Sequence, residues 1–216
     1  ISSQVSANVE AGFSIVTYTG TGVNATVGHG LGVAPKMVIH FNRNVAYDHA
    51  VWHSALLGTE GLRLNTTAAK STDATLWNST VPSSTVVSLG TSGLTNYNQQ
   101  VAYCFADVPG YQKIGSYTGN GSTDGPFVHC GFKPRFIMYK RSDAASNWVI
   151  WDSARSPDNV VNDYLLPNSS GAEATLDTLD ITSNGFKLRT TNADNNGGTI
   201  VYIAIAEVNG KYALGR

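Results

Sequence analysis

The chain contains an internal repeat, and this repeat constrains the fold more than any other feature of the sequence. Residues 15–55 align with residues 114–154 at a spacing of 99, and eleven of the 41 positions are identical. Composition alone would give roughly two or three matches. The identical positions include Tyr-Thr-Gly-x-Gly from 18 and 117, Gly-x-x-Pro from 32 and 131, and Trp-x-Ser-Ala from 52 and 151. A tandem duplication of a unit of about 100 residues, the size of a small domain, is therefore expected.

The same spacing returns near the end of the second copy. Tyr103 in VAYCFADV lies 99 residues before Tyr202 in IVYIAIAEV. We therefore expect Tyr103 to superpose on Tyr202, and Trp52 on Trp151. The predicted organisation is a lead-in segment at 1–11, a first repeat at 12–108 and a second repeat at 109–216. Because the join at 108–110 is too short for a flexible linker, the two repeats should pack against each other.

Short runs rich in Val, Ile, Thr, Tyr and Phe alternate along the chain with clusters of Gly, Asn, Ser and Pro. This pattern is typical of strands and turns, and no window shows the apolar spacing of an amphipathic helix. The first repeat predicts strands at 13–18, 24–28, 36–42, 49–55, 61–65, 85–89 and 101–107. The second predicts strands at 112–117, 126–130, 135–141, 147–153, 163–167, 179–182, 185–190 and 199–206. The predicted fold class is all-β, with each repeat forming an antiparallel, jelly-roll-like β-sandwich.

Charge and hydrophobicity exclude several classes of protein. Charged residues are only 13% of the chain and the net charge is −1, so there is no electrostatic signature for nucleic acid or an anionic membrane. The hydrophobic content of 42% is high enough for a folded core. The longest apolar run, at 200–206, is far too short to span a bilayer. We expect a globular protein with neither nucleic-acid binding nor membrane insertion.

The two cysteines align with aliphatic positions of the other repeat. At the spacing of 99, Cys104 falls on Ile203 and Cys130 on Leu31. Each is therefore interpreted as a small buried hydrophobe. Free thiols are favoured over a disulfide, because neither spacing nor compartment indicates pairing.

Motifs for catalysis and cofactors are missing from the sequence. There is no Gly-x-Ser-x-Gly, no Walker loop, no HExxH and no CxxC. A glycosidase needs two carboxylates across a cleft, and nothing in the sequence pairs Glu60 or Glu173 into such a site. The Gly20-Thr-Gly22 stretch resembles a dinucleotide-binding loop only weakly, because no helix is expected after it. We predict a protein that is not an enzyme and has no cofactor.

Two stretches could bind a metal ion. His49 and His53 are four residues apart, but on a strand this spacing separates them by about 14 Å. The Asn-Ala-Asp-Asn-Asn-Gly-Gly stretch at 192–198 could offer oxygen ligands to calcium, although Asn-Gly and Gly-Gly favour a hairpin turn. Surface histidines and a turn are the preferred interpretation, and no metal site is predicted.

Repeated residues have structural explanations. Gly20, Gly22, Gly119 and Gly121 are expected to supply the positive φ of a tight turn. Trp52 and Trp151 occupy equivalent strands with apolar neighbours, and a sandwich commonly packs one large aromatic residue between its sheets. These two tryptophans are predicted core residues.

Positions that differ between the repeats are better candidates for binding. The segment ending at Trp77, Asp-Ala-Thr-Leu-Trp, aligns with Glu-Ala-Thr-Leu-Asp ending at Asp177. Because the position accepts Asp, Trp77 is predicted to be an exposed aromatic that stacks on a sugar or enters a subunit interface. The alternative is that it covers a loop of its own repeat. Tyr47 and His49 align with different residue types in the second repeat and, with His53, complete the candidate binding set.

Several long motifs resemble a duplicated β-domain found toward the C-terminal end of tail-fibre and other virion proteins of phages, notably phages of marine bacteria. The stretches that carry the resemblance are GFSIVTYTGTG, HGLGVAPKMVIHFNR, LRLNTTAA, the run from VAYCFADV to FIMYKR, WVIWDSARSP and AIAEVNGKYA. It covers about residues 12–216. The resemblance implies a virion location, a homotrimeric fibre context and contact with a host surface, but it brings no catalytic set.

The expected function is therefore that of a virion structural protein, a tail-fibre or appendage domain that attaches to a host-surface glycan or receptor and assembles with other virion proteins. The alternative is a purely architectural subunit of a capsid or tail. A polysaccharide depolymerase is less favoured, because a β-helix enzyme would repeat every 20 to 30 residues or so.

Overall fold

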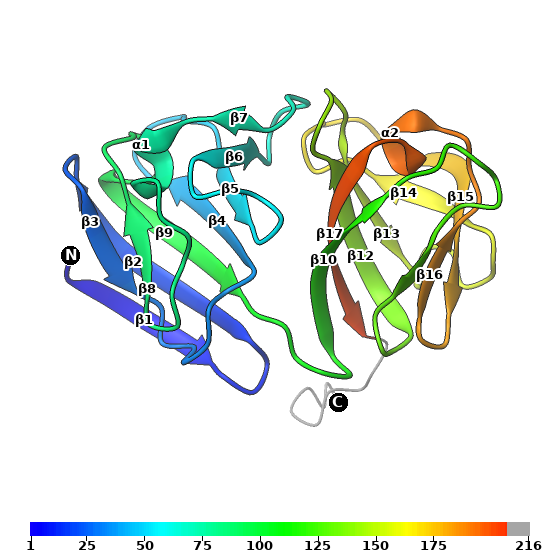
Figure 1. The fold of residues 1–216 in the computed structure, drawn as a ribbon, viewed down its shortest axis with the longest axis horizontal. Coiled ribbons are helices and arrows are strands. Elements are labelled where there is room, and N and C mark those ends of the chain that lie inside the picture. The colour runs from blue at the N-terminus through cyan, green and yellow to red at the C-terminus, as the bar shows by residue number, and fades with distance from the viewer. Residues whose placement is uncertain (207–216) are drawn as a thin grey trace.

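The computed structural model describes residues 1–206. The chain is all-β, with two main antiparallel sheets of seven and eight strands, and one of these is a nearly closed barrel. The two halves of the chain form the left and right parts of the molecule in Figure 1. The first sheet has the order β1-β2-β9-β4-β5-β6-β7, and a separate pair, β3-β8, accompanies it. The second has the order β10-β17-β12-β13-β14-β15-β16-β11.

In the first half, the elements are β1 (Ser3–Asn8), β2 (Phe13–Thr21), β3 (Ala25–Gly28), β4 (Met37–Asn42), β5 (Ala50–His53), β6 (Glu60–Arg63), β7 (Ser71–Thr72), α1 (Ala74–Trp77), β8 (Val86–Leu89) and β9 (Tyr97–Phe105). In the second half they are β10 (Gln112–Thr118), β11 (Phe127–His129), β12 (Pro134–Arg141), β13 (Trp148–Asp152), β14 (Val161–Leu165), β15 (Ala174–Thr182), β16 (Gly185–Leu188), α2 (Ala193–Asn196) and β17 (Thr199–Ala206). Every strand expected from the sequence is present.

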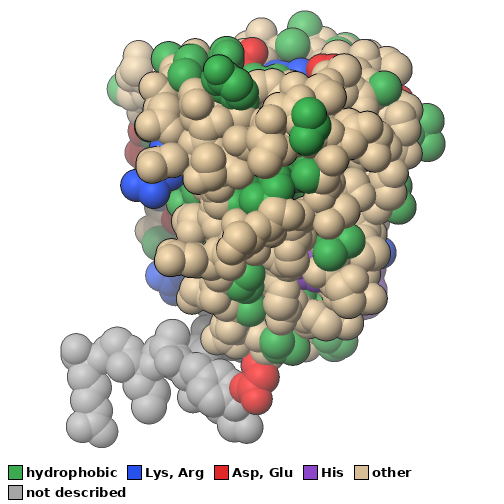
Figure 2. All heavy atoms as spheres, turned by 90° about the vertical axis from the view of Figure 1, so that its left-hand side faces the viewer, with side chains coloured by type: hydrophobic (Ala, Val, Ile, Leu, Met, Phe, Trp, Pro, Cys, Tyr) green, Lys and Arg blue, Asp and Glu red, His purple; other side chains and the backbone are tan. Residues whose placement is uncertain are grey.

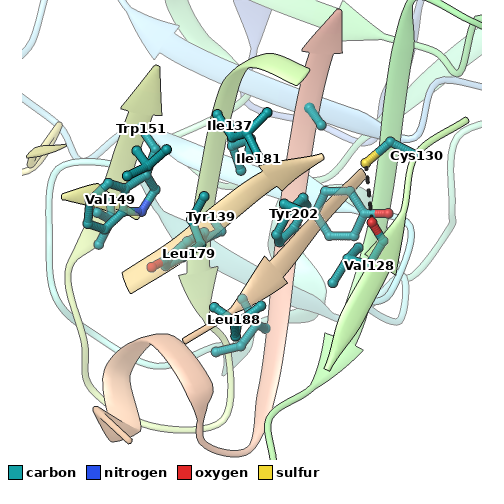
Figure 3. Packing of buried hydrophobic residues seen from close by; sticks show 14 of the residues in the cluster. Val128, Cys130, Ile137, Tyr139, Val149, Trp151, Leu179, Ile181, Leu188 and Tyr202 are labelled. Carbon is teal, nitrogen blue, oxygen red and sulfur yellow. Dashed lines mark hydrogen bonds between the residues drawn. The ribbon is translucent and has the colours of Figure 1, made fainter. Parts of the chain in front are cut away.

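Alternation of side chains builds three hydrophobic clusters. In β2, Ser14, Val16 and Tyr18 are buried, while the residues between them are half-buried, as the two-residue period of a strand requires. One cluster lies inside the first half around Trp52 and a second inside the second half around Trp151. Figure 3 shows the second cluster, with side chains from β12, β13, β15 and β17 converging. A third cluster draws on both halves.

The third cluster forms the seam between the halves and confirms that they pack together. It joins Met37, Ile39, Val51, Leu56 and Leu62 of the first half to Ile114, Met138, Trp148, Val201 and Ile203 of the second. Hydrogen bonds cross the same seam. The Trp148 Nε1 donates to the Arg63 carbonyl at 2.8 Å, and the Lys140 Nζ donates to the Thr67 carbonyl at 3.1 Å. Burial of apolar surface with paired polar groups holds the halves in one orientation.

Strand registers show how far the repeat persists in three dimensions. Val38 pairs with Trp52 on one side and Cys104 on the other. Ile137 pairs with Trp151 and with Ala204. The superposition of Trp52 on Trp151 is thus confirmed. Relative to these pairs, the last strand of the second half is displaced by one residue from the spacing of 99.

The predicted match of Tyr103 with Tyr202 is therefore wrong. Tyr103 pairs with Ile39 and packs against the seam, whereas Tyr202 pairs with Tyr139 and lies in the core of the second half. A one-residue slip in a strand moves a side chain to the opposite face. Cys104 accordingly corresponds to Ala204 rather than to Ile203. Both Cys104 and Cys130 are free and buried, as expected.

Residues 1–11 are more than a lead-in segment. β1 pairs along its whole length with β2, from Ser3 opposite Tyr18 to Asn8 opposite Phe13. This strand forms one edge of the first sheet, and its side chains are mostly exposed. The polar sequence of β1 did not predict a strand, because an edge strand exposed on both faces lacks the apolar alternation by which strands are recognised.

The repeated Tyr-Thr-Gly-x-Gly motif wraps around a buried asparagine in each half. Asn96 accepts from the Thr21 amide and donates to the Val23 and Gly90 carbonyls, and Asn196 makes the corresponding bonds in the second half. A Cβ on Gly20 would lie 2.3 Å from the Asn96 backbone. Only the second glycine of each motif, at 22 and 121, has a positive φ. The first glycine of each motif is required instead because the backbone of the asparagine lies too close to it for a Cβ.

Candidate ligand-binding groove

Trp77, the leading binding candidate from the sequence, lies in the core. It is 1% exposed, and its Nε1 donates to the Glu60 carbonyl at 2.9 Å. Its ring also packs on His40. The segment before it forms the short helix α1, capped by Asp73, whose carboxylate accepts from the Thr75 amide at 2.9 Å. The helical turn points the indole inward, so the prediction of an exposed, sugar-stacking Trp77 is wrong, and the indole is part of the core of its own repeat.

His53 is also excluded from surface binding. It is 1% exposed at the seam, where its Nδ1 accepts from the Ala55 amide at 3.1 Å. This fixes the proton on Nε2, which donates to the Tyr202 carbonyl at 3.3 Å. Burial lowers the pKa of His53 to about 4. Its role is to join the two halves in the neutral form.

Tyr47 and His49 remain near the surface. Tyr47 is 37% exposed, and its ring lies over Gly93, where an added Cβ would come within 3.0 Å of it. His49 is half-buried and stacks at a tilt on Phe41, with ring centroids 4.3 Å apart. Desolvation lowers the pKa of His49. These two residues are accessible but line none of the pockets described below.

A polar groove of about 370 Å³ lies on the first sheet, across β1, β2 and β9. It is lined by Ser2, Ser3, Gln4, Thr17, Tyr18, Thr19, Arg43, Gln99 and Gln100. We call it the β1–β9 groove. The strand pairing sets its layout, since Gln4 lies opposite Thr17 and Thr19 lies opposite Gln99. The Arg43 amide donates to the Gln99 carbonyl at 2.8 Å, which places Arg43 next to the pair formed by Thr19 and Gln99.

The groove side chains are free to contact a ligand. Within residues 1–206, the side chains of Gln4, Thr17, Thr19, Arg43 and Gln99 form no hydrogen bond or ion pair. They offer two amides and two hydroxyls, which both donate and accept, and one guanidinium, which only donates. Because four of the five are carried by paired strands, they are held on a rigid surface. The arrangement fits a hydroxyl-rich ligand, with a place for an anionic group at Arg43.

The aromatic residue beneath the groove has a structural role. Tyr18 is buried, and its hydroxyl donates to the Thr95 carbonyl at 2.5 Å. Burial raises the pKa of Tyr18 well above its usual value. With its proton committed to Thr95, the Tyr18 oxygen accepts from the Nδ1 of His40 at 2.9 Å. Tyr18 therefore supports the groove floor instead of serving as an acid.

The outer side of the first half has few charges. Figure 2 shows this side dominated by uncharged polar groups and backbone, with scattered hydrophobic side chains and charges mainly at its margins. Within the described residues, no group of three His, Cys, Asp or Glu side chains is placed to hold a metal ion. No helix among residues 1–206 is long and apolar enough to cross a membrane.

Little in the sequence signals the groove. Its residues come from three strands and one loop that are far apart in the chain, and one of the strands, β1, was not predicted. A fold prediction that paired residues 3–8 with β2 would have brought Gln4 beside Thr17. Before that pairing was known, these were ordinary surface residues.

The comparisons with known proteins identify a family. Residues 1–209 match the family described as a domain of unknown function, DUF7483. No curated protein and no solved structure matches the chain. Because the match covers nearly the whole sequence, the chain belongs to the DUF7483 family.

Proposed function

We propose that the protein is a virion structural protein, a tail-fibre or appendage domain that attaches the particle to a glycan on the host surface. The β1–β9 groove, with its unengaged amide, hydroxyl and guanidinium groups, is the observation that carries the binding part of the proposal. The resemblance of the long sequence motifs to phage fibre domains supports the virion part. The proposed activity is binding without catalysis.

The chemistry of the groove favours an acidic glycan. Hydroxyl groups of a sugar both donate and accept, and the amides of Gln4 and Gln99 match them on both counts. Arg43 is the one cation among the residues that line the groove, and it fits a carboxylate or sulfate through paired hydrogen bonds. A glycan lying across β1 and β9 would place its charged group at the Arg43 end.

The test is binding of the 216-residue chain to immobilised acidic and neutral glycans, and to host cells. Arg43→Ala should weaken binding to acidic glycans by at least about tenfold, or 1.4 kcal/mol, with unchanged thermal unfolding. Arg135→Ala is the matched control, because Arg135 is an exposed arginine in the second half. Equal binding by wild type and Arg43→Ala would contradict a role for the groove. Failure of the wild-type chain to bind any glycan or host cell would contradict attachment itself.

An architectural role is the second candidate, and the edge strand β1 favours it. β1 contains no charged residue or proline, so little prevents it from pairing with another strand. Such pairing would support the proposed homotrimer or contact with other virion proteins. Analytical ultracentrifugation at micromolar concentration tests this, with Val5→Lys as the variant that should dissociate the assembly. A monomeric wild type would count against the trimer. A depolymerase remains the least favoured function, tested by incubation with host polysaccharide.

We also propose that each half descends from one ancestral β-sandwich of about 100 residues, the size of a small domain. The matched pairings of Val38 with Trp52 and of Ile137 with Trp151 support this origin. The equivalent hydrogen bonds that Asn96 and Asn196 make with the repeated motif support it independently.

A further inference from the structure

β1 is a free edge of the first sheet. It stands last in the order of that sheet, and β2 is its only partner strand among residues 1–206. Figure 1 draws it along the lower left margin of the first half. One of its faces carries the β1–β9 groove, and on the other Gly30 lies so near Val5 that an added Cβ would come within 3.0 Å of that side chain. The direction left open for a partner is the edge itself.

The pairing of β2 shows which backbone groups of β1 point outward. The Ala106 amide donates to the Gly12 carbonyl at 2.8 Å, which continues the register of β2 with β9. In an antiparallel ladder every second residue bonds to the same neighbour, so the even-numbered residues of β2 bond to β9 and the odd-numbered ones to β1. Thr17 pairs with Gln4, and Gln4 therefore bonds inward. The residues of β1 whose amides and carbonyls point away from the sheet are Ser3, Val5 and Ala7.

This edge has none of the usual protection against pairing with another strand. Natural edge strands are shielded by charged side chains, proline or bulges, whereas β1 has no charged residue and no proline. Its register with β2 runs without a shift from Ser3 to Asn8. Its outward amides and carbonyls form no hydrogen bond with any of residues 1–206. Such an edge is suited to receive another strand.

The other edges of the described chain are shorter or protected. β7 has two residues, β11 has three, and β3 and β8 have four each. β10 is longer, but it contains Lys113, and outward amides at its start are already bonded. The Gln112 amide donates to the Val108 carbonyl at 2.9 Å, and the Ile114 amide donates to the Asp107 carboxylate at 2.8 Å. The edge best able to receive β1 is therefore β1 of a second copy.

β1 is complementary to itself in one antiparallel register. When the two Val5 residues lie opposite each other, Ser3 of each copy faces Ala7 of the other. Every outward residue then exchanges both of its hydrogen bonds with the second copy. The two exposed Val5 side chains meet on one face, while Gln4 faces Ser6 on the other. Because β1 has no charged residue, this register brings no like charges together.

We propose that two copies of the chain join through β1, antiparallel and about a two-fold axis at Val5, so that their first sheets become one continuous sheet. Directly opposed residues of antiparallel strands lie on the same face, so the β1–β9 grooves of both copies open to the same side. The grooves then form one longer binding surface with an Arg43 at each end. This inference rests on the architectural role proposed above for β1 and names the strand that pairs with it. A two-fold axis closes the assembly at two copies, so a trimer needs a different surface.

A strand from another protein is the competing occupant of this edge, because sheet edges also bind foreign strands by strand addition. The self-complementary register favours a second copy. It uses all the outward backbone groups, opposes two apolar side chains and brings no like charges together. The two occupants differ in how they respond to a charge placed at position 5, and the experiment uses this difference.

The experiment measures the mass of the 216-residue chain by analytical ultracentrifugation over a range of concentrations. Wild type should form a dimer of two 22.9 kDa chains. The dissociation constant should be on the order of 100 µM, because paired strands alone bury less than the roughly 1,200 Å² of a standard interface. Val5→Pro removes an amide that points outward and leaves the bonds to β2 in place. It should weaken dimerisation at least about tenfold, with nearly unchanged thermal unfolding.

A charge exchange tests the two-fold axis. Val5→Lys and Val5→Glu should each be monomeric, because like charges then lie directly opposite each other. An equimolar mixture of these two variants should form a heterodimer, because position 5 of one copy faces position 5 of the other. Val23→Lys and Val23→Glu are the matched controls at an exposed valine beyond the end of β2. Both controls should dimerise like wild type.

The proposal is overturned if wild type stays monomeric at about 1 mM, a concentration about ten times the expected dissociation constant. It is also overturned if Val5→Pro dimerises like wild type, or if the Lys and Glu variants at position 5 fail to associate when mixed. Arg43→Ala should leave the mass of the dimer unchanged, which separates failure here from failure of the groove. An acidic glycan long enough to reach both grooves should bind more tightly to wild type than to Val5→Pro. Equal binding would contradict the joined grooves.

Discussion

The indole of Trp77 packs against the imidazole of His40, with ring centroids 5.3 Å apart and an interplanar angle of 53°. This contact closes the core of the first half, and Tyr139 stands in place of His40 in the second half. The two repeats thus place different side chains at equivalent positions of one scaffold.

Replacing Trp77 should destabilise the protein as strongly as replacing a recognised core tryptophan. Trp77→Ala and Trp52→Ala should each lower the free energy of unfolding by roughly 3 to 5 kcal/mol, because each removes a buried indole and leaves a cavity. Tyr47→Ala, at an exposed position, should cost only about 0.5 kcal/mol. Urea denaturation of the three variants measures the difference. A Trp77→Ala variant as stable as Tyr47→Ala would show that the indole is not part of the core.

Acid should destabilise the fold through buried histidines. Burial lowers the pKa of His40 to about 3 and that of His53 to about 4, and it also lowers the pKa of His29. Below the unfolded value near 6.5, the unfolded state takes up protons that the folded state refuses. Stability is therefore complete above pH 6.5 and falls as the pH drops from 6.5 toward 4. The free energy of unfolding at pH 7, 6, 5 and 4 tests this, and His53→Gln should flatten part of the slope. An unchanged slope in His53→Gln would contradict a neutral His53 in the fold.

Lys140 should make stability rise further with pH in alkaline solution. Its Nζ donates to the Thr67 and Ser146 carbonyls at the seam, and burial lowers its pKa to about 8. Between pH 8 and 10.5 the folded state releases this proton before the unfolded state does, so the Lys140 contribution to stability rises with pH. The buried cysteines oppose the trend above pH 9, because burial raises their pKa to about 12. The difference between wild type and Lys140→Met, measured from pH 7 to 9.5, isolates the lysine. A constant difference would contradict this assignment.

Asn96 should be as important to folding as a core hydrophobe. Its side chain bonds to the Thr21 amide and to the Val23 and Gly90 carbonyls, at 2.9, 2.6 and 2.6 Å. Asn96→Ala would leave buried backbone groups unpaired and should cost about 3 kcal/mol or more. Thermal unfolding of Asn96→Ala and Asn196→Ala would compare the two halves. Asn24→Ala provides a control, because that nearby residue is exposed and has no positive φ. Equal melting temperatures for Asn96→Ala and Asn24→Ala would contradict these structural hydrogen bonds of Asn96.

The sequence by itself determined the repeat, the positions of the principal strands and the core roles of Trp52 and Trp151. These features are local or periodic. Alternation in a strand and turn chemistry depend on near neighbours, and the constant spacing preserved the pairing of Val38 with Trp52 in its copy, Ile137 with Trp151.

The local sequence also held one signal that separates Trp77 from Asp177. Asp73 caps α1 through its short side chain, whereas Glu173, one methylene longer, pairs with Arg155 at 3.0 Å instead. Aspartate is a strong N-cap and glutamate is not. The five-residue alignment of the two segments therefore did not imply the same conformation or the same exposure.

Only the tertiary structure decided the burial of His53 at the seam, the displacement of Tyr202 from Tyr103 and the β1–β9 groove. Each depends on contacts between segments far apart in the chain, such as the bond from His53 to the Tyr202 carbonyl. A single strand carries no information about which sheet will cover its second face. Whether a polar or aromatic side chain is exposed is therefore fixed when the two halves pack, because packing, and not residue type, determines what water can reach.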